Sequence, residues 1–263
     1  MDLQIAGKAA LVTGSTAGIG LAIARKLATE GARVILSGRD RARLDGAVDG
    51  ILSSGASDVT SIVADITTPE GAEILLRRAP EVDILVNNLG IYEAKPFAAI
   101  TDADWQHYFD VNVMSGVRLT RHYFPRMLER KSGRVIFISS ETGLAVDPGM
   151  IHYAMTKTAQ LSIARGLANL TKGTAVTVNS VMPGPTRSDG IIEFLRSVSG
   201  NPHATAEEAE AEFFATARSG SLLQRMIEAE EIANMVAFLA SPLSAATNGA
   251  AIRLEGGLIN SLA

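Results

Sequence analysis

The sequence predicts an α/β fold, in which one doubly wound parallel sheet of about seven strands is covered by helices on both faces. Short apolar runs rich in β-branched residues alternate with longer segments of helical period. Such alternation implies right-handed crossovers, and these place consecutive strands parallel. The chain has 263 residues, 47% of them hydrophobic, which suits one large core. We find no internal repeat, so we expect residues 1–263 to form a single domain.

Seven runs are short, apolar and rich in β-branched residues, and we expect each to form a strand. They are Ala9–Val12, Val34–Ser37, Val59–Ala64, Ile84–Asn87, Val135–Ser139, Val176–Val181 and Ala250–Leu254. Segments of helical period lie between them, at Leu21–Glu30, Ala42–Ser53, Pro69–Arg78, Asp102–Arg130 and Tyr153–Thr171. In such sheets ligands bind beyond the carboxyl ends of the strands, so the functional motifs should follow strands.

The stretch after the sixth strand breaks this alternation. It opens with Pro183-Gly184-Pro185, and an acidic, alanine-rich piece, Ala204–Ala217, would suit an exposed helix. A long excursion at the carboxyl end of a strand is typical of an active-site lid. We therefore expect a substrate lid over approximately residues 185–220, with a plain surface insertion as the alternative.

Composition excludes several classes of function. The net charge of −4 is not the basic footprint of a nucleic-acid-binding protein. No apolar run approaches the roughly 18 residues of a membrane span, and the first residues lack the regions of a signal peptide. There are no cysteines, and the four histidines show no metal-ligand spacing. We expect a cytoplasmic, metal-free protein with no membrane or nucleic-acid partner.

A glycine-rich loop follows the first strand and opens a helix. It reads Thr13-Gly14-Ser15-Thr16-Ala17-Gly18-Ile19-Gly20. Without Cβ atoms the backbone can turn tightly and let a pyrophosphate approach the N–H groups at the positive end of the following helix. A plain turn is the alternative, but the position in an alternating α/β chain predicts a Rossmann-type dinucleotide site.

The end of the second strand indicates which dinucleotide is bound. Arg39 and Asp40 stand there. An arginine favours a 2′-phosphate through charge-assisted hydrogen bonds, whereas an acidic residue would accept from a ribose hydroxyl. Asp40 can instead cap the next helix, and Arg39 can be a solvated turn residue. The pair predicts NADP(H) rather than NAD(H).

A hydroxyl, a phenol and an ammonium group form the candidate reaction centre. Tyr153 and Lys157 are four residues apart and share one face of a helix. Ser140 ends the apolar run Val135–Ser139. A neighbouring cation favours the phenolate form of tyrosine, so we expect Lys157 to lower the pKa of Tyr153. These groups suit acid–base chemistry on a carbonyl or an alcohol.

These features together resemble the short-chain dehydrogenase/reductase family over nearly the whole chain. The nearest-looking branch is that of 3-oxoacyl-carrier-protein reductases and similar NADPH-dependent carbonyl reductases. The resemblance is carried by Thr13–Gly20, Asp65, Asn87-Asn88-Leu89-Gly90, Asn112, Ser140, Tyr153-Ala154-Met155-Thr156-Lys157 and Pro183-Gly184 with Thr186. Leu89 departs from the alanine usual in this motif, and Ser188 stands where threonine is common.

The resemblance implies a role for each matching residue. Tyr153 would be the general acid in reduction and the general base in oxidation, Lys157 would hold the nicotinamide ribose, Ser140 would bind the substrate oxygen, and Asn112 would support a proton relay. Asn87 would serve cofactor or scaffold hydrogen bonds. Cofactor contacts would come from Gly14, Ser15, Thr16, Gly18, Ile19, Gly20, Arg39, Asp65, Ile66, Asn88, Gly90, Tyr153, Lys157, Pro183, Gly184 and Thr186.

The substrate is less well defined by the sequence. Residues between the serine and the tyrosine can line its pocket: Glu141, Thr142, Val146, Asp147, Met150 and His152. His152 should point elsewhere, because its neighbour Tyr153 must face the site. We expect a small-molecule carbonyl or alcohol substrate. A sugar or polyol dehydrogenase and an NADP(H)-binding sensor with weak turnover are the alternatives. The resemblance also implies a homo-oligomer, a tetramer or dimer built on the helices over Asp102–Arg130 and Tyr153–Thr171.

Overall fold

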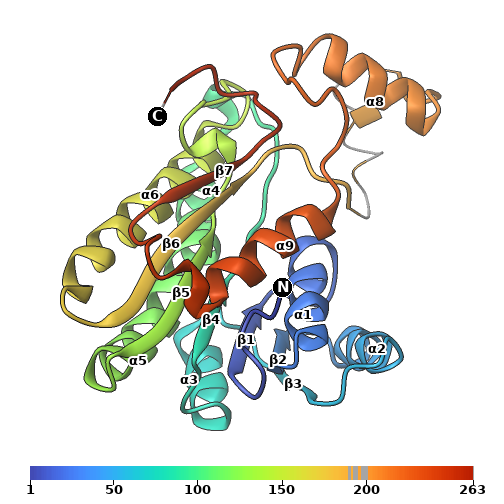
Figure 1. Cartoon of the computed structure of the whole chain (residues 1–263). Helices are drawn as coiled ribbons and strands as arrows, with labels where there is room; N and C mark the ends of the chain where they lie inside the picture. The colour runs from blue at the N-terminus through green and yellow to red at the C-terminus, as the bar shows by residue number, and fades with distance from the viewer. Residues whose placement is uncertain (189–190, 192–194, 197–200, 263) are drawn as a thin grey trace.

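The computed structural model describes residues 1–188, 191, 195–196 and 201–262 (Figure 1). Seven strands form one parallel sheet in the order β3-β2-β1-β4-β5-β6-β7. The strands are β1 (Ala9–Thr13), β2 (Arg33–Gly38), β3 (Val59–Val63), β4 (Ile84–Asn87), β5 (Ser132–Ile138), β6 (Ala175–Pro183) and β7 (Ala251–Leu254). The chain reverses its direction of winding between β3 and β4. β3 pairs with β2 at one edge of the sheet, whereas β4 pairs with β1 on the side away from β2. The predicted doubly wound sheet is confirmed.

Helices cover both faces of this sheet (Figure 1). One core holds buried side chains of α1 (Gly18–Thr29), α2 (Arg41–Leu52) and α9 (Ala229–Ala240). The opposite core holds those of α3 (Pro69–Arg78), α5 (Ser115–Glu129) and α6 (Ile151–Ala168). α4 (Asp102–Phe109) precedes α5 and packs against α6.

Alternation along the strands explains why there are two cores. Leu11 and Leu85 point into one core, whereas Val12 and Val86 point into the other, and all four are fully buried. Complete burial of an aliphatic side chain contributes about 1.5–3 kcal/mol, so both faces stabilise the strand ends on which the site depends.

Local signals in the sequence set several helix boundaries. Thr68 accepts a hydrogen bond from the Gly71 backbone N–H at 3.1 Å and caps α3 just before Pro69. Asp40 accepts from the Arg43 backbone N–H at 3.0 Å and caps α2, as its alternative interpretation predicts. Such caps contribute about 1 kcal/mol each.

One predicted helical segment is divided in two, one helix is missing from the predictions, and α8 forms as expected but is less exposed. The segment Asp102–Arg130 is not one helix, because a π-helical turn over Asp110–Met114 separates α4 from α5. α9 is not among the predicted helices, although its Ile232 and Val236 are fully buried. α8 (Ala206–Ala215) is not simply exposed, because it buries Phe213 and Phe214 in a third apolar cluster.

Part of the predicted lid over residues 185–220 lies within the described residues. Residues 189–190, 192–194 and 197–200 of this stretch lie outside the described residues. In the described part, the cluster around α8 also includes Leu195 and Met226. The role of this segment as a lid stays a prediction.

Two features are absent from the described part of the chain, a membrane-spanning helix and a metal-binding cluster. In it, no helix combines the length and the apolar character needed to cross a bilayer. The same residues contain no cluster of three or more histidine, aspartate or glutamate side chains that could hold a metal ion.

Candidate active site

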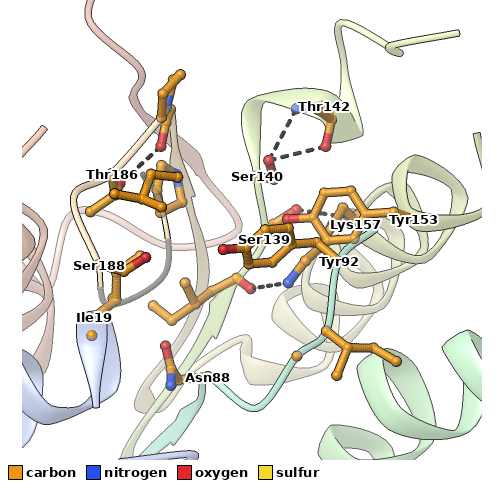
Figure 2. A pocket seen from close by; sticks show the side chains of 18 of the residues that line it. Ile19, Asn88, Tyr92, Ser139, Ser140, Thr142, Tyr153, Lys157, Thr186 and Ser188 are labelled. Carbon is orange, nitrogen blue, oxygen red and sulfur yellow. Dashed lines mark hydrogen bonds between the residues drawn. The ribbon is translucent and has the colours of Figure 1, made fainter. Parts of the chain in front are cut away.

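A cavity of about 440 Å³ opens at the carboxyl ends of β1, β4, β5 and β6, where the switch in winding lies (Figure 2). Loops from these four strands therefore bring together residues far apart in the sequence. Most of the predicted site residues line it: Gly14, Gly18, Ile19, Gly20, Asn88, Gly90, Ser140, Tyr153, Lys157, Pro183, Gly184 and Thr186.

The glycine loop forms one end of this cavity. Gly14 and Gly18 have φ of 60° and 52°, a conformation that glycine adopts without strain. A Cβ on Gly20 would lie 2.3 Å from the Gly14 carbonyl oxygen, so only glycine fits there. The N-cap of α1, Ala17, has no side chain that caps the helix, and its first turn has no acidic residue. The free N–H groups and positive end of α1 therefore fit a pyrophosphate.

Hydrogen bonds between β1 and β4 hold this loop in place. The Thr13 hydroxyl accepts from the backbone N–H groups of Asn88 at 2.9 Å and Leu89 at 3.0 Å. The Asn88 amide in turn donates to the carbonyls of Thr13 at 2.9 Å and Gly14 at 3.1 Å. Asn88 therefore supports the loop and also lines the cavity.

Six of the predicted site residues do not line the cavity. They are Ser15, Thr16, Arg39, Asp65, Ile66 and Asn112. The Ser15 hydroxyl is fully buried, donates to the Val12 carbonyl at 2.8 Å and accepts from the Ser37 N–H at 3.1 Å, so the cofactor contact of Ser15 stays a prediction. The side chain of Ile66 lies in the core. Thr16 lines a neighbouring hollow of about 350 Å³.

Arg39 and Asp65 lie side by side beyond the ends of β2 and β3. Their nearest charged atoms are 3.9 Å apart, and 76% of the Arg39 side chain is exposed. The Asp65 carboxylate accepts from the backbone N–H and the hydroxyl of Thr67 at 3.1 Å and 2.7 Å. Arg39 is thus extended into solvent and free to meet a phosphate.

Ser140, Tyr153 and Lys157 meet at the other end of the cavity (Figure 2). The Lys157 ammonium donates to the Ile138 carbonyl at 2.9 Å and lies 5.6 Å from the centre of the Tyr153 ring. The Ser140 hydroxyl donates to the Glu141 carboxylate at 2.6 Å and accepts from the Thr142 hydroxyl at 3.0 Å. The predicted spacing thus does bring hydroxyl, phenol and ammonium together.

Burial dominates the electrostatics of this centre. It raises the pKa of Tyr153, and the nearby Glu141 carboxylate raises it further, while a hydrogen bond with Ser140 opposes both. In the protein alone the net shift in the pKa of Tyr153 is therefore upward, opposite to the expected net lowering. Burial also lowers the pKa of Lys157 from 10.5 to about 8, against the attraction of Glu141. Tyr153 is a protonated phenol at neutral pH.

Asn112 lies in the π-helical turn. Such turns are frequent at functional sites. Its side chain accepts from the Ile91 N–H at 2.8 Å and donates to the Ile91 carbonyl and the Thr156 hydroxyl, both at 3.0 Å. The Gln160 amide donates to the Asn112 carbonyl at 2.6 Å. Asn112 thereby ties the loop after β4 to the helix of Tyr153, and the proton relay stays a prediction.

Asn87 and His152 are buried polar side chains that lie outside the reaction centre. Asn87 donates to the Thr120 hydroxyl at 3.0 Å. His152 is fully buried, packs on Tyr108 with ring centres 4.2 Å apart, and does not line the cavity. The prediction that His152 points away from the site is confirmed.

On the substrate side, Glu141, Thr142 and Met150 line the cavity as expected, whereas Val146 and Asp147 do not. Sequence reasoning missed Arg43, Tyr92, Phe213 and Arg218. For Arg218 no local signal exists, because it follows α8 and meets Glu141 only through the fold. Arg43 lies in the first turn of α2, the helix capped by Asp40, and lines the cavity.

Comparison with known proteins agrees with this geometry. Residues 8–196 match the family described as short chain dehydrogenase. The chain is 51% identical to the uncharacterized oxidoreductase YvaG of Bacillus subtilis (strain 168), over all of both chains. It is 31% identical to the 3-oxoacyl-[acyl-carrier-protein] reductase FabG of Escherichia coli (strain K12), over 97% of this chain and 99% of that one. It is also similar to the structure of L-sorbose reductase from Gluconobacter frateurii with NADPH and L-sorbose, at 30% identity and a TM-score of 0.91 over all of both chains.

Proposed function

The chain belongs to the short-chain dehydrogenase family, and from that premise we propose that it interconverts a ketone and a secondary alcohol with NADP(H) as cofactor. One observation carries the proposal. A glycine loop fitted to a pyrophosphate and the group of Ser140, Tyr153 and Lys157 border the same cavity.

The choice of NADP(H) has two supports. Arg39 is exposed at the end of β2, where its guanidinium can meet a 2′-phosphate. The similar L-sorbose reductase was solved with NADPH. Gly14, Gly18 and Gly20 would hold the pyrophosphate, and Lys157 the nicotinamide ribose.

The residues of this chain supply the proton and the orientation. When bound, NADPH supplies the hydride. Tyr153 holds its proton at neutral pH, because burial and Glu141 raise its pKa, and it donates that proton to the substrate oxygen. Ser140 would orient the same oxygen by turning its hydroxyl from Glu141 to donate to that oxygen. Lys157 places positive charge beside the Tyr153 ring and stabilises the phenolate left after transfer.

The substitution Tyr153→Phe tests this assignment, because it removes only the phenol oxygen. Turnover of ketones should fall by about 10²–10⁴-fold, the usual contribution of a positioned acid. NADPH affinity, measured by fluorescence titration, should stay within about threefold of the wild type. Turnover that survives the substitution would refute the role of Tyr153. NADPH binding without turnover of any ketone by the wild type would instead favour the sensor.

Reduction of sugars is the second candidate. The similarity to L-sorbose reductase extends over both whole chains, whereas the similarity to FabG favours acyl thioesters. Steady-state kinetics with a ketohexose and a 3-oxoacyl thioester separates the two candidates.

A further inference from the structure

The side chain of Glu141 is an unusual neighbour for a reaction centre. It is only 6% exposed, lines the cavity, and immediately follows Ser140. Burying a carboxylate costs several kcal/mol unless its oxygens are well paired. One oxygen, Oε2, accepts from the Ser140 hydroxyl at 2.6 Å. The other, Oε1, lies 3.9 Å from Nε of Arg218, which is too far for a hydrogen bond.

Arg218 faces Glu141 across this gap, and its Nε is a hydrogen-bond donor. Its Nη2 donates to the Asp147 carboxylate at 3.1 Å, and its guanidinium stacks 5.6 Å from the centre of the Phe213 ring. These contacts hold the guanidinium in place. Nε, however, is buried and has no hydrogen-bond partner among the described residues. Buried N–H groups nearly always have a hydrogen-bond acceptor, so we expect a ligand atom to supply the acceptor for Nε.

We propose that Glu141 and Arg218 form a subsite for a hydroxyl group next to the reacting carbonyl, and that the substrates are neutral hydroxy ketones and the corresponding diols. The proposal rests on the proposed function. A hydroxyl both donates and accepts, and an oxygen about 2.8 Å from Oε1 and from Nε closes a 3.9 Å gap between them. Because Oε2 touches the Ser140 hydroxyl, the bound hydroxyl belongs to a carbon beside the carbonyl.

Charge at the subsite favours a neutral substrate over an acid. Arg218 already pairs with Asp147 and faces Glu141, so two carboxylates surround one guanidinium. A substrate carboxylate in this position would meet net negative charge. An ordinary ketone would leave Nε and Oε1 without the partner that a hydroxyl supplies.

Three ketones with the same butyl arm test the subsite. They are 1-hydroxyhexan-2-one, its methyl isostere heptan-3-one, and 2-oxohexanoate. With NADPH, kcat/KM for the hydroxy ketone should exceed that for each of the others by about tenfold or more, the effect of leaving a buried polar group unpaired. Equal values for the hydroxy ketone and heptan-3-one, or a preference for the acid, would overturn the subsite and leave ketone reduction standing. No turnover of any ketone would overturn both.

Two variants locate the preference in these side chains. Arg218→Met and Glu141→Leu should each bring the ratio of kcat/KM for hydroxy ketone to heptan-3-one close to one. The ratio is decisive because Glu141 also touches Ser140, and its loss lowers turnover of every ketone. If Glu141→Leu does not fold, Arg218→Met alone decides.

Arg187→Met is the matched control. Arg187 also anchors α8, because it forms ion pairs with Glu210 of α8 at 2.9 Å and with Glu228 at 3.0 Å, but it does not line the cavity. The control should keep the wild-type ratio. If Arg187→Met also brought the ratio of kcat/KM for hydroxy ketone to heptan-3-one close to one, anchoring of the chain around α8 would explain both results. That outcome would overturn the subsite.

Discussion

Lys157 carries its ammonium group in a buried position beside the Tyr153 ring. Burial lowers its pKa from 10.5 to about 8, while the Ile138 carbonyl and the Glu141 charge support the ion. Between these pH values the unfolded chain binds more protons than the folded one. The contribution of Lys157 to stability is therefore unfavourable below pH 8 and improves as pH rises through that window.

The substitution Lys157→Met, which removes the ammonium group and keeps an unbranched side chain one atom shorter, tests this linkage. The free energy of unfolding of the wild type relative to the variant should rise by on the order of 1–2 kcal/mol from about pH 8 to about pH 10. The measurement is urea denaturation at several pH values. The exposed Lys172→Met controls for the loss of one surface charge. A difference that falls or stays level over this range would contradict the prediction.

Arg39 is a second single residue with a testable role, because we expect it to set the preference for NADPH over NADH. Arg39→Asp replaces a donor to a 2′-phosphate by an acceptor for a ribose hydroxyl. The ratio of kcat/KM for NADPH to that for NADH should fall by about 10–100-fold, the range of charge-assisted hydrogen bonds. Arg41→Asp is the control, because Arg41 is exposed nearby and pairs with Asp45. An unchanged ratio in Arg39→Asp would remove Arg39 from the phosphate site.

Among the elements, the π-helical turn over Asp110–Met114 bears most directly on the site. One extra residue in the helix turns Asn112 inward, where it holds both backbone groups of Ile91 and the Thr156 hydroxyl. A Cβ on Gly90 would lie 3.3 Å from the Lys157 ammonium and 3.4 Å from Asn112 Oδ1. The turn thus sets how closely the loop after β4 approaches the reaction centre.

Asn112→Leu should destabilise the fold by about 2–4 kcal/mol, because it leaves the partly buried N–H and carbonyl of Ile91 unpaired and removes the buried bond to Thr156. Chemical denaturation measures this loss. Gln106→Leu removes an exposed amide one turn earlier, which bonds Asp110 at 3.0 Å, and should change stability by no more than about 0.5 kcal/mol. Similar losses in the two variants would show that the network around Asn112 adds nothing specific.

At the scale of the whole molecule, we expect a tetramer or a dimer that uses α4, α5 and α6. Gly166 offers a sharp probe, because it is exposed on α6 and a Cβ there would meet nothing within 4 Å. Gly50 on α2 is exposed and equally open, on the other side of the sheet. An arginine at either position should therefore not clash with other residues of the same chain.

Gly166→Arg should therefore lower the mass measured by light scattering, because a charged side chain in the contact opposes association. Gly50→Arg should keep the mass of the wild type. A wild type that is monomeric at working concentration would contradict the expected assembly. A Gly166→Arg variant with unchanged mass would move the contact away from this part of α6.

The sequence by itself determined what local physics controls. Period and apolar runs determined the strands and most helices, because side-chain alternation is a property of neighbouring residues. The glycine loop is likewise determined locally, since Gly14 and Gly18 need positive φ and Gly20 needs an absent Cβ. The spacing of Tyr153 and Lys157 was enough to put both on the cavity wall.

Only the tertiary structure decided the features that depend on distant contacts and on burial. The π-helical turn has no local signature, because Asn112 is held there by Ile91 and Thr156. Burial reversed the expected shift in the pKa of Tyr153, since desolvation depends on everything packed around the ring. Arg218 reaches Glu141 from the segment after α8, a distance in sequence that only folding closes.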